Sequence, residues 1–257
     1  MTRFDGQSIV ITGGAAGIGA ATAEAFLRLG GSVVIVDHET AQLEAKRQEL
    51  SSLGIVVAVT ADVSIEADVV RYVAAAVTAF GRIDVFFNNA GVEGPMERIV
   101  DTEVEEFDRV LAVNLRGCFL GLKHVLRVMT AQGSGSVINS SSVAGLSGSP
   151  RLGAYVASKH GVTGLTKVAS LEVAASGIRV NSIHPSPVNT EMMRSLESGL
   201  SQGVAESTRQ AFTRAIPLAR YGEPDDIAQL VVFLGSDASS FITGAQYRID
   251  GGMGAKS

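Results

Sequence analysis

The chain has 257 residues, of which 46% are hydrophobic and 18% are charged. A chain this apolar folds, and one of this length buries enough surface to need neither disulfides nor a structural metal. Acidic residues outnumber basic ones by 26 to 21, and there is a single cysteine. Phosphate neutralisation needs a basic face, and a cysteine metal cluster needs several thiols. We therefore expect a cytoplasmic protein with no metal, no nucleic-acid partner and no membrane partner.

Short runs rich in β-branched residues alternate with segments long enough to form helices. The predicted strands are Ser8–Thr12, Ser32–Val36, Ile55–Val59, Ile83–Phe87, Ser136–Asn139, Ile178–Ser182 and Gln246–Ile249. Most of these runs are continuously apolar, which is typical of strands buried on both faces of a parallel sheet. The alternation of strand and helix predicts one α/β domain over residues 1–257, a doubly wound parallel sheet with helices on both faces.

One segment, at about residues 185–218, interrupts this alternation. It begins with two prolines, continues with the pair Met192-Met193, and becomes a mixed amphipathic stretch. Open α/β sheets bind ligands outside the carboxyl ends of their strands. We predict that this segment crosses that edge of the sheet as a small substrate lid.

A glycine-rich turn follows the first predicted strand. Gly13, Gly17 and Gly19 would let the backbone turn tightly, approach a pyrophosphate and place the next helix against the strand. Asp37 ends the second strand, where a carboxylate accepts hydrogen bonds from an adenosine ribose. Together these features predict a Rossmann-like dinucleotide site that prefers NAD, because Asp37 would repel the 2′-phosphate of NADP.

Three motifs occur in one order along the chain: Thr12-Gly-x-x-x-Gly17-x-Gly19, then Asn88-Asn-Ala-Gly91, then Tyr155-x-x-x-Lys159. In this the chain resembles the short-chain dehydrogenase/reductase family, and the resemblance extends from Gly6 to Gly252. It implies a Rossmann-fold oxidoreductase that depends on a nicotinamide cofactor, and it suggests a homotetramer.

The resemblance also implies a set of cofactor-binding positions. Where the family usually has Pro-Gly after the sixth strand, this chain has Pro185-Ser186, which puts the local backbone path near the nicotinamide in doubt. The expected cofactor-binding residues are Gly13, Gly17, Ile18, Gly19, Asp37, Asp62, Val63, Asn89, Tyr155, Lys159, Val188 and Thr190.

Tyr155 and Lys159 are four residues apart in a predicted helix, so their side chains share one face. Moving a tyrosine pKa from about 10 to about 7.5 requires about 3.4 kcal/mol. One cation at ~4 Å and an effective dielectric of ~20 supplies about 4 kcal/mol before desolvation is subtracted. With an oxidised nicotinamide ring nearby, the spacing therefore predicts a general base.

The resemblance implies two further members of the catalytic group. Ser142, at the end of the fifth strand, would hydrogen-bond the substrate oxygen, and Asn114 would hold a water for proton relay. Register alone favours Ser142 over Ser140 and Ser141. The catalytic residues expected are thus Asn114, Ser142, Tyr155 and Lys159.

The expected substrate pocket is largely apolar. Its candidate walls are Glu93, Val143, Leu152, Ser186, Met192 and Met193. Methionine adapts to irregular apolar shapes, which suits a bulky or cyclic substrate. Glu93 would either accept a second substrate hydroxyl or be solvated.

We therefore expect an NAD-dependent oxidoreductase that transfers a hydride between nicotinamide and a neutral secondary alcohol or ketone, cyclic or aryl-substituted. A 3-oxoacyl carrier-protein reductase and a sugar or polyol dehydrogenase are alternatives within the same family. A non-catalytic NAD-sensing regulatory protein is the alternative from another class, although such a protein would not need Ser142, Tyr155 and Lys159 together.

Overall fold

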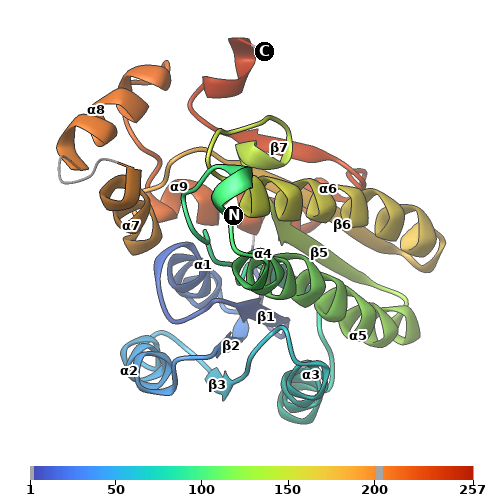
Figure 1. The fold of residues 1–257 in the computed structure, drawn as a ribbon. Coiled ribbons are helices and arrows are strands. Elements are labelled where there is room, and N and C mark those ends of the chain that lie inside the picture. Colours follow the sequence, from blue (N-terminus) through green and yellow to red (C-terminus); the bar gives the residue numbers. More distant parts are fainter. Residues whose placement is uncertain (1–2, 201–204, 257) are drawn as a thin grey trace.

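The computed structural model describes residues 3–200 and 205–256 (Figure 1). Within these residues, seven strands form one sheet in the order β3-β2-β1-β4-β5-β6-β7, and all neighbouring strands are parallel. The strands are β1 Ser8–Thr12, β2 Ser32–Asp37, β3 Val56–Thr60, β4 Val85–Asn88, β5 Gly135–Ser140, β6 Ile178–Pro185 and β7 Gln246–Ile249. The predicted doubly wound α/β sheet is confirmed. The largest difference is in β6, which continues past Ser182 because its last residues pair with β7 as far as Pro185.

Helices cover both faces of the sheet (Figure 1). One face carries α1 Gly17–Arg28, α2 Thr40–Leu50 and α9 Pro224–Gly235, with a core that includes Phe26, Ile35 and Val231. The other face carries α3 Glu66–Phe80, α5 Gly117–Gln132 and α6 Gly153–Val173. The strands contribute side chains to both cores, which explains why they read as continuous apolar runs.

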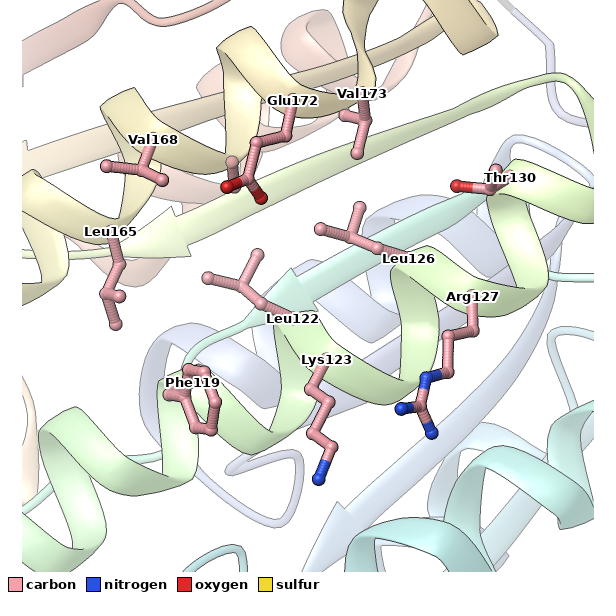
Figure 2. A pocket seen from close by; sticks show the side chains of 11 residues that line it. Phe119, Leu122, Lys123, Leu126, Arg127, Thr130, Leu165, Val168, Glu172 and Val173 are labelled. Atoms are coloured by element: carbon pink, nitrogen blue, oxygen red, sulfur yellow. The ribbon is translucent and has the colours of Figure 1, made fainter.

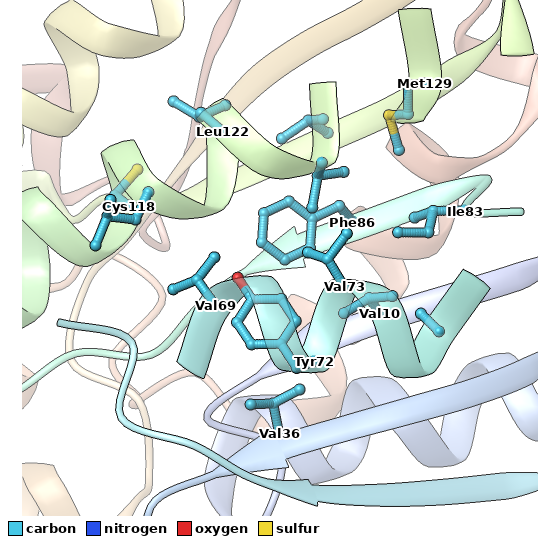
Figure 3. Packing of buried hydrophobic residues seen from close by; sticks show 14 of the residues in the cluster. Val10, Val36, Val69, Tyr72, Val73, Ile83, Phe86, Cys118, Leu122 and Met129 are labelled. Carbon is cyan, nitrogen blue, oxygen red and sulfur yellow. The ribbon is translucent and has the colours of Figure 1, made fainter. Parts of the chain in front are cut away.

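Figure 3 shows the second of these cores. Tyr72 of α3 and Phe86 of β4 lie with ring centroids 6.5 Å apart, beneath Cys118 and Met129 of α5. Burial raises the pKa of the Cys118 thiol to about 12. Cys118 is therefore a packing residue, because the reactive form of cysteine is the thiolate.

The strands β2 and β3 lie on one side of β1, and the strands from β4 to β7 lie on the other. The order in which strands are added to the sheet therefore changes direction at β1. Such a switch point opens a crevice at the carboxyl ends of the strands. The helix α4 Val104–Leu111 leads to this edge and continues as a π-helical turn, Ala112–Arg116, before α5. π-Helical turns inside α-helices are frequent at functional sites.

Two helices of the predicted lid, α7 Glu191–Leu200 and α8 Ala205–Ala215, pack together beside the body of the domain (Figure 1). A small apolar cluster joins Met193 of α7 to Ile216 and Tyr221 in the segment after α8. Residues 201–204 of the predicted lid lie outside the described residues. In the part of the chain that the structure describes, no helix is both long and apolar enough to span a membrane.

Candidate active site

A cavity of ≈ 610 Å³ opens at the carboxyl edge of the sheet. Eleven of the twelve expected cofactor residues line it. They are Gly13, Gly17, Ile18, Asp37, Asp62, Val63, Asn89, Tyr155, Lys159, Val188 and Thr190. Gly19 does not line the cavity and lies in α1, against the turn.

The glycine turn has the backbone geometry that its sequence predicts. Gly13 and Gly17 have φ angles of +66° and +51°, which side chains disfavour. A Cβ atom on Gly19 would collide with the carbonyl of Gly13. At the amino end of α1, the N-cap residue Ala16 provides no side-chain cap, and the first turn contains no acidic residue. These uncapped N–H groups and the close-set turn fit the pyrophosphate of a dinucleotide.

The segment after β4 braces this turn. The Thr12 hydroxyl accepts hydrogen bonds from the backbone N–H groups of Asn89, at 2.9 Å, and Ala90, at 3.1 Å. The Asn89 amide in turn donates to the Thr12 carbonyl at 3.0 Å. Asn89 thus holds the two loops together at the cavity wall, while Asn88 binds the Cys118 carbonyl and the Asn139 side chain below it.

Asp37 closes the other side of the turn. One oxygen of its carboxylate, Oδ2, accepts the backbone N–H of Ala15 at 3.1 Å. The other, Oδ1, accepts the backbone N–H of His38 at 2.8 Å and lies 3.1 Å from the His38 ring nitrogen Nδ1. The carboxylate therefore stands at a fixed place on the cavity wall, directly after β2.

Tyr155 and Lys159 lie one helical turn apart in α6, and the Lys159 Nζ is 5.6 Å from the centre of the Tyr155 ring. Lys159 Nζ donates to the carbonyl of Ser140 at 2.8 Å. Burial lowers the pKa of Lys159 to about 8. The ammonium is thus held between β5 and α6, and it loses its proton as the pH rises through about 8.

The pKa of Tyr155 departs from the expectation. Burial raises the pKa, a hydrogen bond with Ser142 lowers it, and the charge of Glu93 raises it, with a net shift upward. The groups of the protein alone therefore do not make Tyr155 a base at neutral pH. The loss of hydration at this buried phenol disfavours the charged phenolate and outweighs the favourable contacts.

Three consecutive serines at the end of β5 have different roles. Ser140 offers its carbonyl to Lys159, and the Ser141 hydroxyl is buried and donates to the Lys159 carbonyl at 3.0 Å. Of the three, Ser142 is the serine whose hydroxyl acts on the Tyr155 phenol and lowers its pKa. His184 fixes the backbone here, since its Nδ1 lies 2.8 Å from the Ser142 carbonyl. The geometry agrees with the register that selects Ser142.

Asn114 lies behind the cavity, at 2% exposure, and is not among the residues that line it. Its Oδ1 accepts the backbone N–H of Val92 at 2.7 Å, and its Nδ2 donates to the Val92 carbonyl at 2.8 Å and the Ser158 hydroxyl at 3.1 Å. The π-helical turn thus directs Asn114 against the 91–92 segment and α6. In this arrangement Asn114 orients the wall that faces Lys159.

The substrate side of the cavity is mainly apolar. Five of the six expected wall residues line it: Val143, Leu152, Ser186, Met192 and Met193. Glu93 is the exception, because it acts on Tyr155 through its charge but does not line the cavity. Its prediction as a pocket wall is therefore corrected.

Other cavity residues were not predicted from the sequence, among them His38, Arg109, Leu196, Phe212 and Met253. Leu196 is four residues after Met192 in α7, a helical spacing that could have identified it. Arg109 lies one turn before Val113 in the helix that ends in the π turn, and its guanidinium bonds to Glu106 at 2.8 Å. Phe212 and Met253 come from distant segments and have no motif around them.

Comparison with known proteins defines the class. The model of the family described as enoyl-(acyl carrier protein) reductase matches residues 13–254. Levodione reductase of Leifsonia aquatica is 42% identical over 99% of this chain and 96% of its own length. A crystal structure of levodione reductase superposes on this structure with a TM-score of 0.97 at 40% sequence identity. The superposition covers 99% of this chain and 100% of that chain. Cyclohexanol dehydrogenase of Acinetobacter sp. (strain SE19) is 36% identical over 99% of this chain and 97% of its own. NAD⁺-bound xylitol dehydrogenase superposes with a TM-score of 0.93 at 32% identity, covering 96% and 98%.

The chain therefore belongs to the short-chain dehydrogenase/reductase family, as its motifs indicate. It is an oxidoreductase that acts on CH–OH groups with a nicotinamide cofactor.

Proposed function

We propose that this enzyme interconverts neutral cyclic secondary alcohols and their ketones, with NAD as its cofactor. The observation that carries the proposal is the apolar wall beyond Tyr155, formed by Val143, Leu152, Met192 and Phe212. Levodione reductase and cyclohexanol dehydrogenase, two of the relatives, carry the names of cyclic substrates. A flat apolar ring fills such a wall better than a chain of hydroxyl groups would.

The arginines of the lid do not oppose a neutral substrate. Arg194 donates to the Asn189 side chain at 2.9 Å, and the Arg209 guanidinium lies 5.5 Å from the centre of the Tyr221 ring. Neither is among the residues that line the cavity. Arg109 does line it, but its guanidinium is paired with Glu106.

NAD preference rests on Asp37. The carboxylate would accept hydrogen bonds from both ribose hydroxyl groups of the adenosine, and a 2′-phosphate ~4 Å away would be repelled by about 4 kcal/mol at an effective dielectric of ~20. The Gly13–Gly19 turn and the amino end of α1 would hold the pyrophosphate. Val188, by its backbone, and Thr190, by its hydroxyl, would hold the carboxamide, and Ile18, Asp62 and Val63 would complete the dinucleotide site.

In the proposed reaction, NAD, when bound, would supply the acceptor for the hydride of the alcohol carbon. Tyr155 takes the hydroxyl proton at its phenolic oxygen, and Ser142 orients the substrate oxygen beside it. Protonated Lys159 would stabilise the phenolate and bind the nicotinamide ribose. Asn114 holds the backbone of Val92, along which a water would connect the site to solvent. Lys159 and the positive ring of the cofactor would together offset the burial that raises the pKa of Tyr155.

We also propose that the segment from about 185 to 218 acts as a substrate lid on the single domain formed by the chain. Gly199 of α7 packs against Met96, so the lid reaches across to the segment after β4. Substrate would enter between these two segments and would be enclosed when they meet.

A homotetramer in the cytoplasm, expected from the sequence, is part of the proposal. A groove of ≈ 550 Å³ lies between α5 and α6. It is lined by Phe119, Leu122, Leu126, Leu165 and Val168 (Figure 2). The α5 side carries Arg127 and the α6 side carries Glu172, whereas Lys123 is paired with Glu66 of its own chain. A second copy related by a two-fold axis would therefore match the apolar surface and pair Arg127 with Glu172. Light scattering should show a tetramer that Val168→Glu dissociates.

The experiment that tests the function measures NADH absorbance at 340 nm with a panel of alcohols. We expect the highest kcat/KM with cyclohexanol-type alcohols, lower values with xylitol and other polyols, and lower still with carboxylated or phosphorylated analogues. A tenfold advantage for the polyols or for the anions would overturn the neutral cyclic substrate. Comparable kcat/KM for NAD and NADP would overturn the cofactor preference.

A further inference from the structure

His38 lies at the nucleotide end of the cavity and has no part in the mechanism above. It follows Asp37 directly, lines the cavity, and has a side chain that is 69% exposed. Its ring nitrogen Nδ1 is 3.1 Å from Asp37 Oδ1. This is the same carboxylate that is proposed to discriminate between the two cofactors.

The other charges around His38 are acidic. The Glu39 carboxylate, at the start of α2, is 3.4 Å from the His38 Nε2, and Asp62, after β3, lines the same cavity. The glycine turn opposite contributes no charged side chain between Gly13 and Gly19. Arg71 of α3 is held by Asp68 and by the Thr60 carbonyl. Arg109 reaches the cavity from α4, next to the Asn114 turn.

Histidine is the side chain whose charge ordinarily changes between pH 5 and 8. A neutral imidazole leaves the Asp37 charge in place and disfavours a 2′-phosphate. A protonated imidazole at 3.1 Å compensates that charge and adds a cation beside the position of the 2′-hydroxyl. The same protonated ring competes with a ribose hydroxyl for Oδ1, which weakens NAD binding.

We infer that His38 makes the choice between NAD and NADP depend on pH, with NADP accepted more readily when His38 is protonated. The inference rests on the proposed placement of the adenosine ribose at Asp37. It goes beyond a fixed NAD preference, because it assigns to one exposed side chain the ability to relax that preference in acid.

The test is isothermal titration calorimetry of NAD⁺ and NADP⁺ against the full chain at several pH values from 5.5 to 8.5. The measured quantity is the ratio of the two dissociation constants, Kd(NADP⁺)/Kd(NAD⁺). The 2′-phosphate of NADP⁺ itself titrates near pH 6, so the ratio must be compared between variants and not only between pH values.

His38→Gln keeps a polar side chain but removes the titration, and an exposed position tolerates the change. His160→Gln is the matched control, because His160 is exposed on α6 and does not line the cavity. Between pH 8.5 and 5.5, we expect the ratio to fall about threefold to fivefold further in the wild type and in His160→Gln than in His38→Gln, the size typical of an exposed ion pair.

Parallel pH curves for the wild type and His38→Gln would overturn the inference. If NAD⁺ still bound tightly at pH 8.5 and Asp37→Ala still narrowed the ratio, the proposed function would be unaffected by that result. Failure of NAD⁺ to bind at pH 8.5 would instead contradict the proposed cofactor. Equal curves for His160→Gln and His38→Gln, both flatter than the wild type, would assign the effect to general surface charge and would also overturn the inference.

Discussion

The two halves of the cavity are built in different ways. The nucleotide half is formed by the ends of neighbouring strands and is held by backbone hydrogen bonds, such as those from Asn89 and Ala90 to the Thr12 hydroxyl. The substrate half is lined by side chains of α7 and α8 together with Val143 and Leu152, and the two helices pack on a small cluster that includes Ile216 and Tyr221. Backbone geometry constrains the first half tightly, whereas side-chain volume shapes the second. Cofactor binding and substrate choice should therefore respond to different substitutions.

Tyr155 lies between the two halves and gives the largest expected effect. Tyr155→Phe removes the phenolic oxygen and leaves the ring in place, so we expect turnover to fall by about 10²–10⁴-fold while the Kd for NADH changes less than about twofold. Steady-state kinetics and NADH fluorescence titration measure the two quantities.

Tyr247→Phe is the control, because Tyr247 lies in β7 and packs against the core beneath the sheet. It should keep near-normal turnover. If Tyr155→Phe retained more than about a hundredth of the wild-type turnover, Tyr155 would not be the general base. A large change in NADH affinity would show that Tyr155 belongs to the nucleotide half.

Asp37→Ala tests the nucleotide half alone. Loss of the carboxylate removes a repulsion of about 4 kcal/mol at ~4 Å, so the gap in kcat/KM between NAD and NADP should narrow by up to about a thousandfold. Because the side chain is 15% exposed, screening reduces this figure. The kcat for the alcohol with saturating NAD should change little.

The matched control is Glu39→Ala, which removes a neighbouring carboxylate that does not line the cavity. Its effect on the gap should be less than about twofold, because exposed charges are screened. An equal effect from both variants would mean that the general acidity of this edge sets the preference and that Asp37 has no specific place in it.

Most of the residues predicted for the nucleotide half lie together at the cavity, and the reason is physical. A positive φ at Gly13 and Gly17 and a carboxylate at the end of β2 are local requirements. Each of them calls for a particular type of residue at a fixed position in the sequence. The position of Ser142 was predicted from its register at the end of β5. These features depend on the order of residues along one strand and the turn that follows it.

The substrate half and the electrostatics could be predicted only in part. Phe212 and Met253 meet in the cavity through the path of the chain after β6, which no local pattern records. Glu93 was expected to line the cavity and does not. The upward shift in the pKa of Tyr155 depends on the burial of its phenol, and burial is a property of the folded chain as a whole.

The smallest expected effect concerns the substrate half. Phe212 of α8 lines the cavity and also packs against the cluster of Met193, Ile216 and Tyr221. Phe212→Ala removes part of the apolar wall, so we expect KM for a cyclohexanol-type alcohol to rise about tenfold, as one lost hydrophobic contact typically changes specificity 10–200-fold at most. The Kd for NAD⁺ should remain within about twofold, because the cluster meets the nucleotide half through the bond from the Met193 backbone N–H to the Thr190 hydroxyl, which the substitution leaves in place. Phe241→Ala, at a fully exposed phenylalanine outside the cavity, is the matched control and should leave KM unchanged. A parallel rise in KM and in the Kd for NAD⁺ would mean that α8 holds the nucleotide half as well, and the division of the cavity into two independent halves would be wrong.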